Sequence, residues 1–510
     1  MFRQNLLKTY MWQVLSIVLS FVSMFVVTPA LSADKSLYGV YIACLSLTMF
    51  LSYCDFGFVA SGTKFAAEAY ARNDHKEEMH LVGFTTFLLL IMVIPFILVA
   101  LTLSIHPEWL LKGIVNSVQH QIASRLLLLL ILPSITLLPM RIAVMILGIR
   151  IREYIFRRYS SIGSIISIGS VPFLFRAGNY PIVEYFFIVQ CMALFAALAS
   201  LLHIHFKITP LSFGRQVRFS KMLFAKTGRL ATASLIGTIA WILYFELDTV
   251  YISKALGPQA VATFAIALTT TSFMRSLLGN IYSPFIPRMN HFLGVNDEQG
   301  LKNFLKKILS FMMPATILGV LVVTLLYKDL VLAWVGLAYL DSVAVGVIYF
   351  SIYFLSPLQY LGGNLMNAMQ RNRDSILLSL LLTLVYWSGV LLSVDRLGVL
   401  SIAVFKLVAF ILSGTFYGIY IFRFIGAPLQ RAQIYRILKL MLIGGSSAIG
   451  IYLSRWNGTL PFHRLHIGAV FISGAFWWLG GMAVFFLWDH RLAEMKQMLP
   501  RISFNKRISQ

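Results

Sequence analysis

The chain has 510 residues, of which 59% are hydrophobic and only 12% are charged, and its mean hydropathy is +0.81. A soluble globular domain has about a quarter of its residues charged, so this composition excludes one. The net charge of +23 is divided among many short segments between apolar runs. We therefore expect a membrane protein with no nucleic acid partner.

Apolar runs near 20 residues recur along the whole chain, long enough to cross a hydrocarbon core of about 30 Å as helices. They lack the alternation of barrel strands, and only helices or closed barrels can span lipid. The sequence therefore predicts an all-α polytopic membrane protein with about 14 transmembrane helices. The expected spans are 11–33, 37–58, 81–104, 125–148, 159–175, 182–206, 230–253, 259–283, 308–328, 342–366, 375–394, 398–420, 438–453 and 464–488.

Lys and Arg concentrate in the N-terminal segment, the even-numbered connections and the C-terminal tail. Positive charge in short loops marks the cytoplasmic side, so both termini are expected in the cytoplasm. The first span lacks a small-residue cleavage signature and is interpreted as a retained helix, not a signal peptide. The predicted location is a cytoplasmic (inner) membrane crossed many times.

Two stretches indicate an internal repeat, "LYGVYIACLSLTMF" at 37–50 and "AVATFAIALTTTSF" at 260–273. An offset of 223 residues superposes Tyr41 on Phe264 and Thr48 on Thr271. Two six-helix pseudo-repeats with cytoplasmic ends predict a central cavity between the halves. The predicted organisation is a first six-helix bundle at 1–206, a basic linker at 207–229, a second bundle at 230–420, two extra helices at 421–488 and a basic tail at 489–510.

The segment "SADKSLYGVYIACLSLTMFLSYCDFGF…TKFAAEAYAR" (32–72) resembles the opening of Wzx-type polysaccharide flippases. The segment "ELDTVYISKALGPQAVATFAIALTTTSFMR" (246–275) is similar to the start of their second half. These flippases belong to the multidrug/oligosaccharidyl-lipid/polysaccharide exporter superfamily. The resemblance implies translocation of an undecaprenyl-pyrophosphate-linked oligosaccharide, such as an O-antigen, capsule or exopolysaccharide repeat unit. It also implies contact with membrane lipids and with a polysaccharide polymerase or chain-length regulator.

Two acids, Glu246 and Asp248, stand inside the seventh span. At 1.5 Å per residue they lie roughly 24 to 27 Å from its cytoplasmic edge. Two residues apart means opposite helix faces, so Asp248 shares a face with Trp241 and Tyr244. We expect Asp248 to face the cavity and couple transport to protons or cations, with Glu246 as its neighbour and Trp241 and Tyr244 contacting sugars. Structural pairing, for instance with Lys254, is the alternative.

Arg275 and Arg141 fall at one depth, roughly 24 Å below the outer edges of spans 8 and 4. Guanidinium groups match phosphate oxygens, so both are candidate ligands for the pyrophosphate. Asp55 lies slightly deeper, and an Asp55–Arg275 ion pair or snorkelling of Arg141 are the alternatives. Lys406 in span 12 is a possible partner for the acids of span 7.

Other classes of function were weighed against transport. The chain lacks a G-x-x-x-x-G-K-[ST] motif and an HExxH motif, so neither ATP hydrolysis nor a metal site or other cofactor is predicted. A membrane-embedded polysaccharide polymerase or ligase would need acids, histidines or arginines on a large outer loop. The longest outer connection, 105–124, offers only one acid, so the chain is not expected to be an enzyme. A multidrug exporter of the same superfamily remains the nearer alternative.

Overall fold

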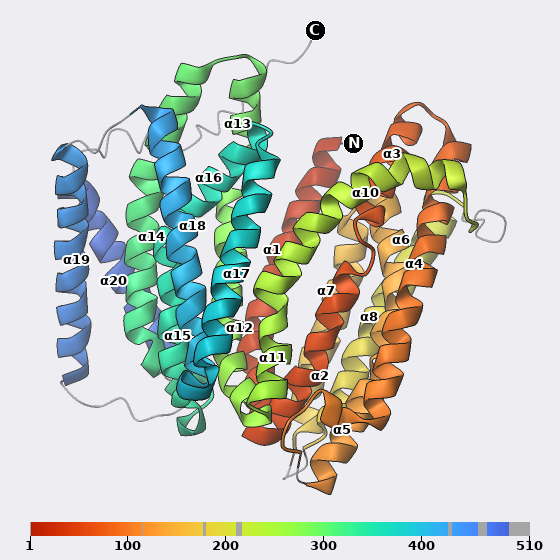
Figure 1. The fold of residues 1–510 in the computed structure, drawn as a ribbon, viewed down its shortest axis with the longest axis horizontal. Coiled ribbons are helices and arrows are strands. Elements are labelled where there is room, and N and C mark those ends of the chain that lie inside the picture. The colour runs from red at the N-terminus through yellow and green to blue at the C-terminus, as the bar shows by residue number, and fades with distance from the viewer. Residues whose placement is uncertain are drawn as a thin grey trace. The chain divides into compact units, whose positions relative to one another are not determined.

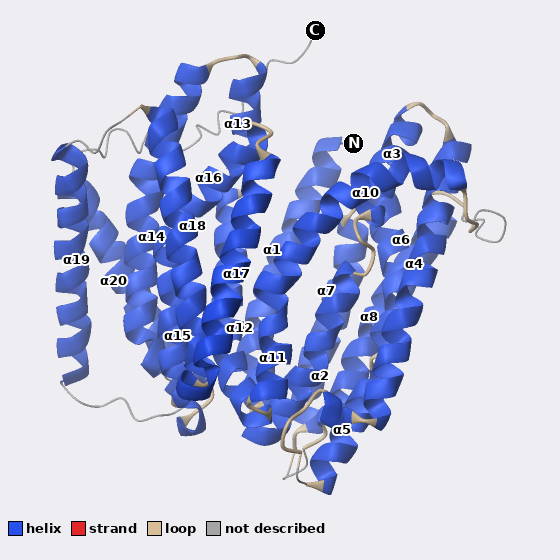
Figure 2. Ribbon diagram, in the orientation of Figure 1, coloured by secondary structure: helices blue, strands red, loops and turns tan. Residues whose placement is uncertain are grey.

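The computed structural model describes residues 2–114, 116–176, 180–210, 217–426, 431–456 and 467–488. The expected basic tail at 489–510 and Arg215 in the expected linker lie outside them. All regular structure in this part of the chain is helical, as Figure 2 shows. The predicted all-α class is confirmed.

Eleven helical stretches in the described residues are long and apolar enough to cross a membrane. Three further long helical segments, α7 (Tyr154–Leu174), α10 with α11 (Lys221–Ala255) and α19 (Arg431–Trp456), bring the number to fourteen. The predicted count therefore fits the structure.

The chain divides into two compact units, which are described separately. Unit 1 comprises Met1–Phe273 and Ile376–Phe405, and unit 2 comprises Met274–Ser375 and Lys406–Gln510. The predicted division at 207–229 concerns a sequence repeat and stays a prediction. The other elements that lie in or begin in unit 1 (Figure 1) are α1 (Phe2–Leu31), α2 (Lys35–Tyr53), α3 (Phe58–Ala71), α4 (His75–Ile105), η1 (Pro107–Trp109), α5 (Ser117–Leu129), α6 (Ile131–Ile149), α8 (Ile182–Lys207), α12 (Pro258–Tyr282), α17 (Asn372–Leu397) and α18 (Val399–Ile425). The other elements of unit 2 are α13 (Phe285–Gly294), α14 (Glu298–Trp334), η3 (Leu337–Tyr339), α15 (Asp341–Ser351), η4 (Ile352–Leu355), α16 (Ser356–Ala368) and α20 (Ile467–Trp488).

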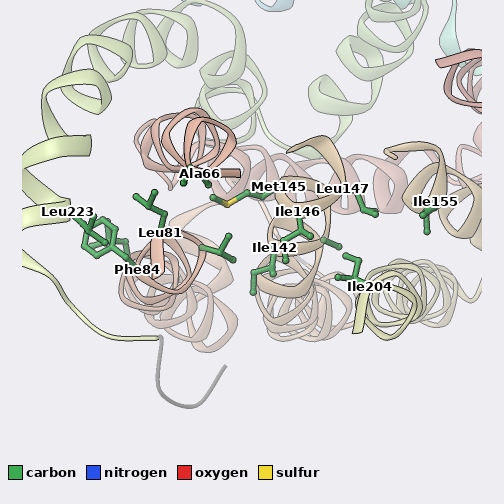
Figure 3. Packing of buried hydrophobic residues seen from close by; sticks show 14 residues of the cluster. Ala66, Leu81, Phe84, Ile142, Met145, Ile146, Leu147, Ile155, Ile204 and Leu223 are labelled. Carbon is green, nitrogen blue, oxygen red and sulfur yellow. The ribbon is translucent and has the colours of Figure 1, made fainter. Parts of the chain in front are cut away.

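Unit 1 is held together by a hydrophobic cluster contributed by α3, α4, α6, α7, α8 and α10 (Figure 3). Ala66 and Ala69 are fully buried on α3, where small side chains let neighbouring helices approach closely. Leu223, near the start of α10, joins the same cluster. The first turns of α10, within the predicted basic linker, therefore belong to the core of unit 1.

Unit 2 has a second cluster, formed by α14, α19 and α20. The Trp478 indole N–H donates to the Ala315 carbonyl oxygen at 3.0 Å, one residue after Pro314 inside α14. The indole therefore adds a side-chain hydrogen bond between α20 and the backbone of α14. The two helices predicted at 421–488 therefore pack on α14.

The span expected at 37–58 is interrupted. α2 ends at Tyr53, α3 begins at Phe58, and Phe56 and Gly57 between them have positive φ angles of 46° and 83°. Glycine adopts this backbone conformation without steric cost, whereas phenylalanine does not. Asp55 thus lies in a break within the helical stretch Lys35–Ala71, which qualifies as one candidate span.

Candidate functional site

The helical segment that carries both acids changes its geometry at Glu246. α10 ends at Trp241, a π-helical turn occupies Ile242–Glu246, and α11 begins at Leu247. Such turns are rare and occur frequently at functional sites. The wider turn shifts the direction of every later side chain, and the two acids that follow one another at its end contact different neighbours, Tyr53 and Tyr386.

Glu246 faces the end of α2. The Tyr53 hydroxyl donates to Glu246 Oε1 at 3.1 Å, and the Trp241 indole N–H is shared between the Tyr53 hydroxyl at 2.9 Å and Glu246 Oε1 at 3.2 Å. All three side chains retain exposed surface, with Trp241 41% exposed. We call Tyr53, Trp241 and Glu246 the Glu246 cluster. It presents a carboxylate, a hydroxyl and an indole face on one surface.

The α2–α3 break lies beside this cluster. Arg141 on α6 donates from Nη2 to the Ser52 carbonyl oxygen at 2.6 Å, which places a cation at the negative end of α2. Its Nε is buried and makes no hydrogen bond in the described residues. Asp55, half-buried, is in the break itself. The break therefore brings one acid and one arginine to the part of unit 1 that holds Glu246.

Asp248 is only 2% exposed and faces α17. The hydroxyl of the fully buried Tyr386 donates to Asp248 Oδ1 at 2.5 Å. Tyr244 packs its ring edge-on against Tyr386, with centroids 5.7 Å apart. The Trp387 indole N–H donates to the Leu243 carbonyl oxygen in the π-helical turn at 2.6 Å. We call Asp248, Tyr244, Tyr386 and Trp387 the Asp248 cluster.

Burial of a carboxylate is costly unless hydrogen bonds or opposite charge compensate it. The Tyr386 hydroxyl supplies one short hydrogen bond to Asp248, and the Trp387 contact fixes α17 on the turn that precedes it. The Asp248 cluster therefore couples the position of α11 to that of α17 through a buried polar contact.

Arg275 belongs to unit 2 and lies in an aromatic environment. The Tyr360 hydroxyl donates to the Arg275 carbonyl oxygen at 3.1 Å, and the Tyr360 ring stacks on Tyr282 at 5.0 Å. The guanidinium charge acts on the hydroxyls of Tyr353 and Tyr360. Lys406, on α18 in the same unit, is 1% exposed. The expected Asp55–Arg275 and Lys406–acid pairs join residues of different units and stay predictions.

Lys254 is the alternative partner for the acids. Its ammonium donates to the Glu108 carbonyl oxygen at 3.3 Å. This contact belongs to a set that joins the α4–α5 loop to the α11–α12 turn. The Ser253 hydroxyl donates to the Leu110 carbonyl oxygen at 2.5 Å, and the Lys112 backbone N–H to the Ser253 carbonyl oxygen at 3.1 Å. At Gly257, with φ +85°, an added Cβ would lie 2.8 Å from the Lys112 carbonyl oxygen. The far end of α11 is thereby fastened to the first bundle.

The acid of this loop, Glu108, has two histidines beside it. His106 Nδ1 lies 3.0 Å from Glu108 Oε1, and His120 Nε2 lies 3.7 Å from Glu108 Oε2. A hydrogen bond from its own backbone N–H, the His106 contact and the charge of the two rings hold the pKa of Glu108 below its ordinary value. The group is fully exposed, so it resembles a surface charge cluster rather than an enclosed reaction site.

Sequence reasoning missed Tyr53, Tyr386 and Trp387, because nothing in a single sequence says which helices touch. One signal was available for the helix break. Asp55, Phe56 and Gly57 interrupt an apolar run with a polar residue and a glycine, which indicates a departure from helix geometry. The sequence carries no comparable signal for the π-helical turn.

Comparisons with known proteins identify solved structures that share this fold. The chain matches the structure of the lipid II flippase MurJ in an inward closed conformation, with a TM-score of 0.68 and 12% identity over 96% of this chain and 100% of that one. It matches an inward-facing MATE multidrug transporter with a TM-score of 0.60 and 14% identity over 79% of this chain and 95% of that one. The fold is that of MurJ and the MATE transporters.

A further match in structure is a transporter of the MOP superfamily from Pyrococcus furiosus, with a TM-score of 0.53, 13% identity and coverage of 83% of this chain and 96% of that one. In sequence, an uncharacterized membrane protein of Bacillus subtilis (strain 168), EpsK, is 29% identical over 180 residues. That alignment covers 33% of this chain and spans about a third, 34%, of the relative. No family model matches the sequence.

Proposed function

We propose that this protein is a flippase that translocates an undecaprenyl-pyrophosphate-linked oligosaccharide across the bacterial cytoplasmic membrane. The substrate is a repeat unit of an O-antigen, capsule or exopolysaccharide. Transport proceeds by alternating access and is coupled to protons or another cation. Both termini lie in the cytoplasm, as the distribution of Lys and Arg predicts.

The observation that carries the proposal is the extent of the match to MurJ. It includes 96% of this chain and all of the flippase, whereas the match to the inward-facing MATE transporter includes 79% of this chain. A lipid-linked substrate also suits the charges in the helices. Such a substrate needs cations for its pyrophosphate and hydroxyl-binding groups for its sugars.

Arg275 and Arg141 are the proposed ligands of the pyrophosphate. A guanidinium has five donors, and the hydrogen bond of Arg141 to the Ser52 carbonyl oxygen uses only one N–H. Trp241 and Tyr244 are the proposed sugar contacts, because an aromatic ring packs against the apolar face of a sugar and the neighbouring carboxylate accepts from its hydroxyls.

Glu246 and Asp248 are the proposed coupling acids. Protonation or cation binding at these carboxylates would change the stability of their contacts with Tyr53 and Tyr386, and so bias the position of α11. Asp55 and Lys406 are proposed as charge partners that compensate the acids and arginines when the halves move. The transport cycle requires no enzymatic step on this chain.

Export of a drug or toxic compound is the second candidate, supported by the MATE likeness and by the same two acids. An exporter of cationic compounds would use Glu246 and Asp248 but has little use for pyrophosphate-binding arginines. The two candidates therefore differ in what Arg275 and Arg141 contribute.

The test is deletion of the gene in its native host, with complementation by wild type, Asp248→Asn, Arg275→Ala or Arg141→Ala. Lys302→Gln is the matched control, because it removes one positive charge whose contacts are an i, i+4 pair with Glu298 and the Phe424 ring. Surface polysaccharide and intracellular lipid-linked repeat units are measured together with membrane levels of each variant.

A flippase predicts loss of surface polymer with intact repeat units accumulating inside, rescued by wild type and Lys302→Gln but not by the other variants. Rescue by all variants would retain the flippase and reduce the named charges to structural roles. Unchanged polysaccharide with altered drug sensitivity would support the exporter instead.

A further inference from the structure

A second polar region lies where the start of α7 meets the end of α8, at the end of unit 1 that holds the α3–α4 turn (Figure 1). Four arginines stand close in sequence there, and two have carboxylate partners. Arg150 pairs with the buried Glu78 at 2.6 Å, and Arg157 reaches Glu153 at 4.0 Å. Within the described residues, Arg152 and Arg158 form no ion pair with a carboxylate.

Arg152 and Arg158 place positive charge at the positive end of α7. α7 begins at Tyr154, so Arg152 and Arg158 flank and occupy its first turns. The start of a helix is its positive end, where anions are favoured and cations are disfavoured. The only acid in this stretch is Glu153. Local charge and helix polarity therefore both favour an anion at this position.

The end of α8 adds further positive charge at the same place. Arg158 Nη2 donates to the Tyr159 hydroxyl at 3.1 Å, and that oxygen lies 3.2 Å from His203 Nδ1 on α8. Arg158 also lies over the Tyr159 ring, 4.9 Å from its centroid. Lys207 follows His203 by one helical turn at the end of α8, and Arg152 lies two residues before the start of α7.

Apolar side chains continue from this basic cluster along both helices. On α8, Phe195, Leu198 and Leu202 are exposed at a spacing that places them on one stripe. Phe195 also contacts the Tyr159 ring edge-on, at 6.5 Å. On α7 the exposed residues nearest the cluster are Ile162, Ile165 and Ile166. A positively charged group thus stands at the head of two apolar stripes.

We infer that Arg152, Arg158 and Lys207, with the Tyr159 hydroxyl, bind the phosphate of an anionic diacyl phospholipid, whose acyl chains lie along the exposed stripes of α7 and α8. Guanidinium and ammonium groups suit phosphate oxygens, and the stripes exclude water from the chains. The positive-inside distribution assigns the site to the cytoplasmic leaflet, where anionic headgroups attract basic residues. This inference is independent of the transported substrate.

The test uses the purified full chain in neutral detergent. Phosphatidylglycerol or phosphatidylcholine of the same acyl composition is titrated in, and bound lipid is counted by native mass spectrometry. Wild type should bind phosphatidylglycerol about tenfold more tightly than phosphatidylcholine, from the attraction of several basic residues to one anionic headgroup.

The double variant Arg158→Gln with Lys207→Gln should lose most of that preference. The matched control, Lys306→Gln with Lys307→Gln, removes the same charge from exposed positions on α14 and should keep it. Tyr159→Phe changes no charge and should weaken phosphatidylglycerol binding several-fold, which tests the site even if the double variant does not fold.

Three results would overturn the inference. Equal binding of the two lipids by wild type would remove the preference for an anion. An equal loss of the phosphatidylglycerol preference in the α14 control would show that the preference depends on the total charge of the protein. Competition by glycerol 3-phosphate as effective as that by phosphatidylglycerol would remove the role of the apolar stripes.

Discussion

The Glu246 cluster and the Asp248 cluster stand side by side on one helix and differ in almost every physical respect. Glu246 keeps exposed surface and accepts hydrogen bonds from Tyr53 and the half-exposed Trp241. Asp248 is buried at 2% exposure and accepts a hydrogen bond from the fully buried Tyr386. The first contact connects the π-helical turn to α2, and the second connects α11 to α17.

In the proposed transport cycle, this difference assigns separate tasks to the two acids. A carboxylate with exposed surface can exchange a proton or contact a ligand without movement of its surroundings. A buried carboxylate can do so only after its neighbours separate, so its ionisation is linked to a change of structure. We infer that Glu246 contacts the transported molecule. We also infer that the ionisation of Asp248 depends on whether α11 and α17 are in contact.

The largest effect is expected for Asp248→Ala. It leaves the buried Tyr386 hydroxyl without its acceptor and opens a small cavity, which together cost about 3 kcal/mol of folding free energy. Asp248→Asn retains an acceptor oxygen and should fold, yet fail in the complementation assay. The measurement is the apparent unfolding temperature of detergent-purified protein. Equal stability of Asp248→Ala and Glu246→Ala would remove the distinction between the clusters.

The next effect compares two tyrosines. Tyr386→Phe deletes a hydrogen bond to a buried carboxylate and should cost about 2 kcal/mol. Tyr53→Phe deletes one to a partly exposed carboxylate, which water can replace, and should cost about 0.5 kcal/mol. Both substitutions keep the ring, so each is the control for the other in the same unfolding measurement. A larger cost for Tyr53→Phe would contradict the assignment of the buried role to Asp248.

Trp241→Phe should affect stability as little as Tyr53→Phe and should affect transport more. The exposed ring loses a shared N–H, for which a cost of about 0.5 kcal/mol is expected. If Trp241 contacts sugars, repeat units should accumulate several-fold over wild type. Phe476→Leu, at an exposed position of α20, provides the control for loss of aromatic surface. Normal flux through Trp241→Phe and also through Trp241→Ala would remove the proposed sugar contact.

The smallest effect is expected at a third acid, Glu108, which is fully exposed. Its pKa is lowered in the folded protein, so its stabilising contribution is present above the ordinary pKa of 4.5 and is lost as the pH falls through the lowered value. The unfolding temperatures of wild type and Glu108→Gln should therefore differ slightly at neutral pH and converge in acid. Divergence in acid would reverse the sign of the linkage.

Much of the architecture could be predicted from the sequence because a bilayer restricts the possibilities. Continuous apolar runs in lipid must be helices, since no water is present to satisfy the backbone. Acids in such a chain are few, so Glu246 and Asp248 were recognised as unusual before their surroundings were known. The two C-terminal helices were visible for the same reason, as apolar runs beyond the repeat.

The partners of those acids could not be predicted in this way. The α2–α3 break and the π-helical turn both depend on which backbone groups find partners on neighbouring helices. Trp387 takes the Leu243 carbonyl oxygen, and Arg141 takes that of Ser52. The sequence by itself determined that α-helices cross the membrane and that two of its rare acids lie within one of them. Only the tertiary structure decided which acid is buried. A single π-helical turn redirects the side chains that follow it, and the contacts that stabilise this turn come from residues far away in the chain.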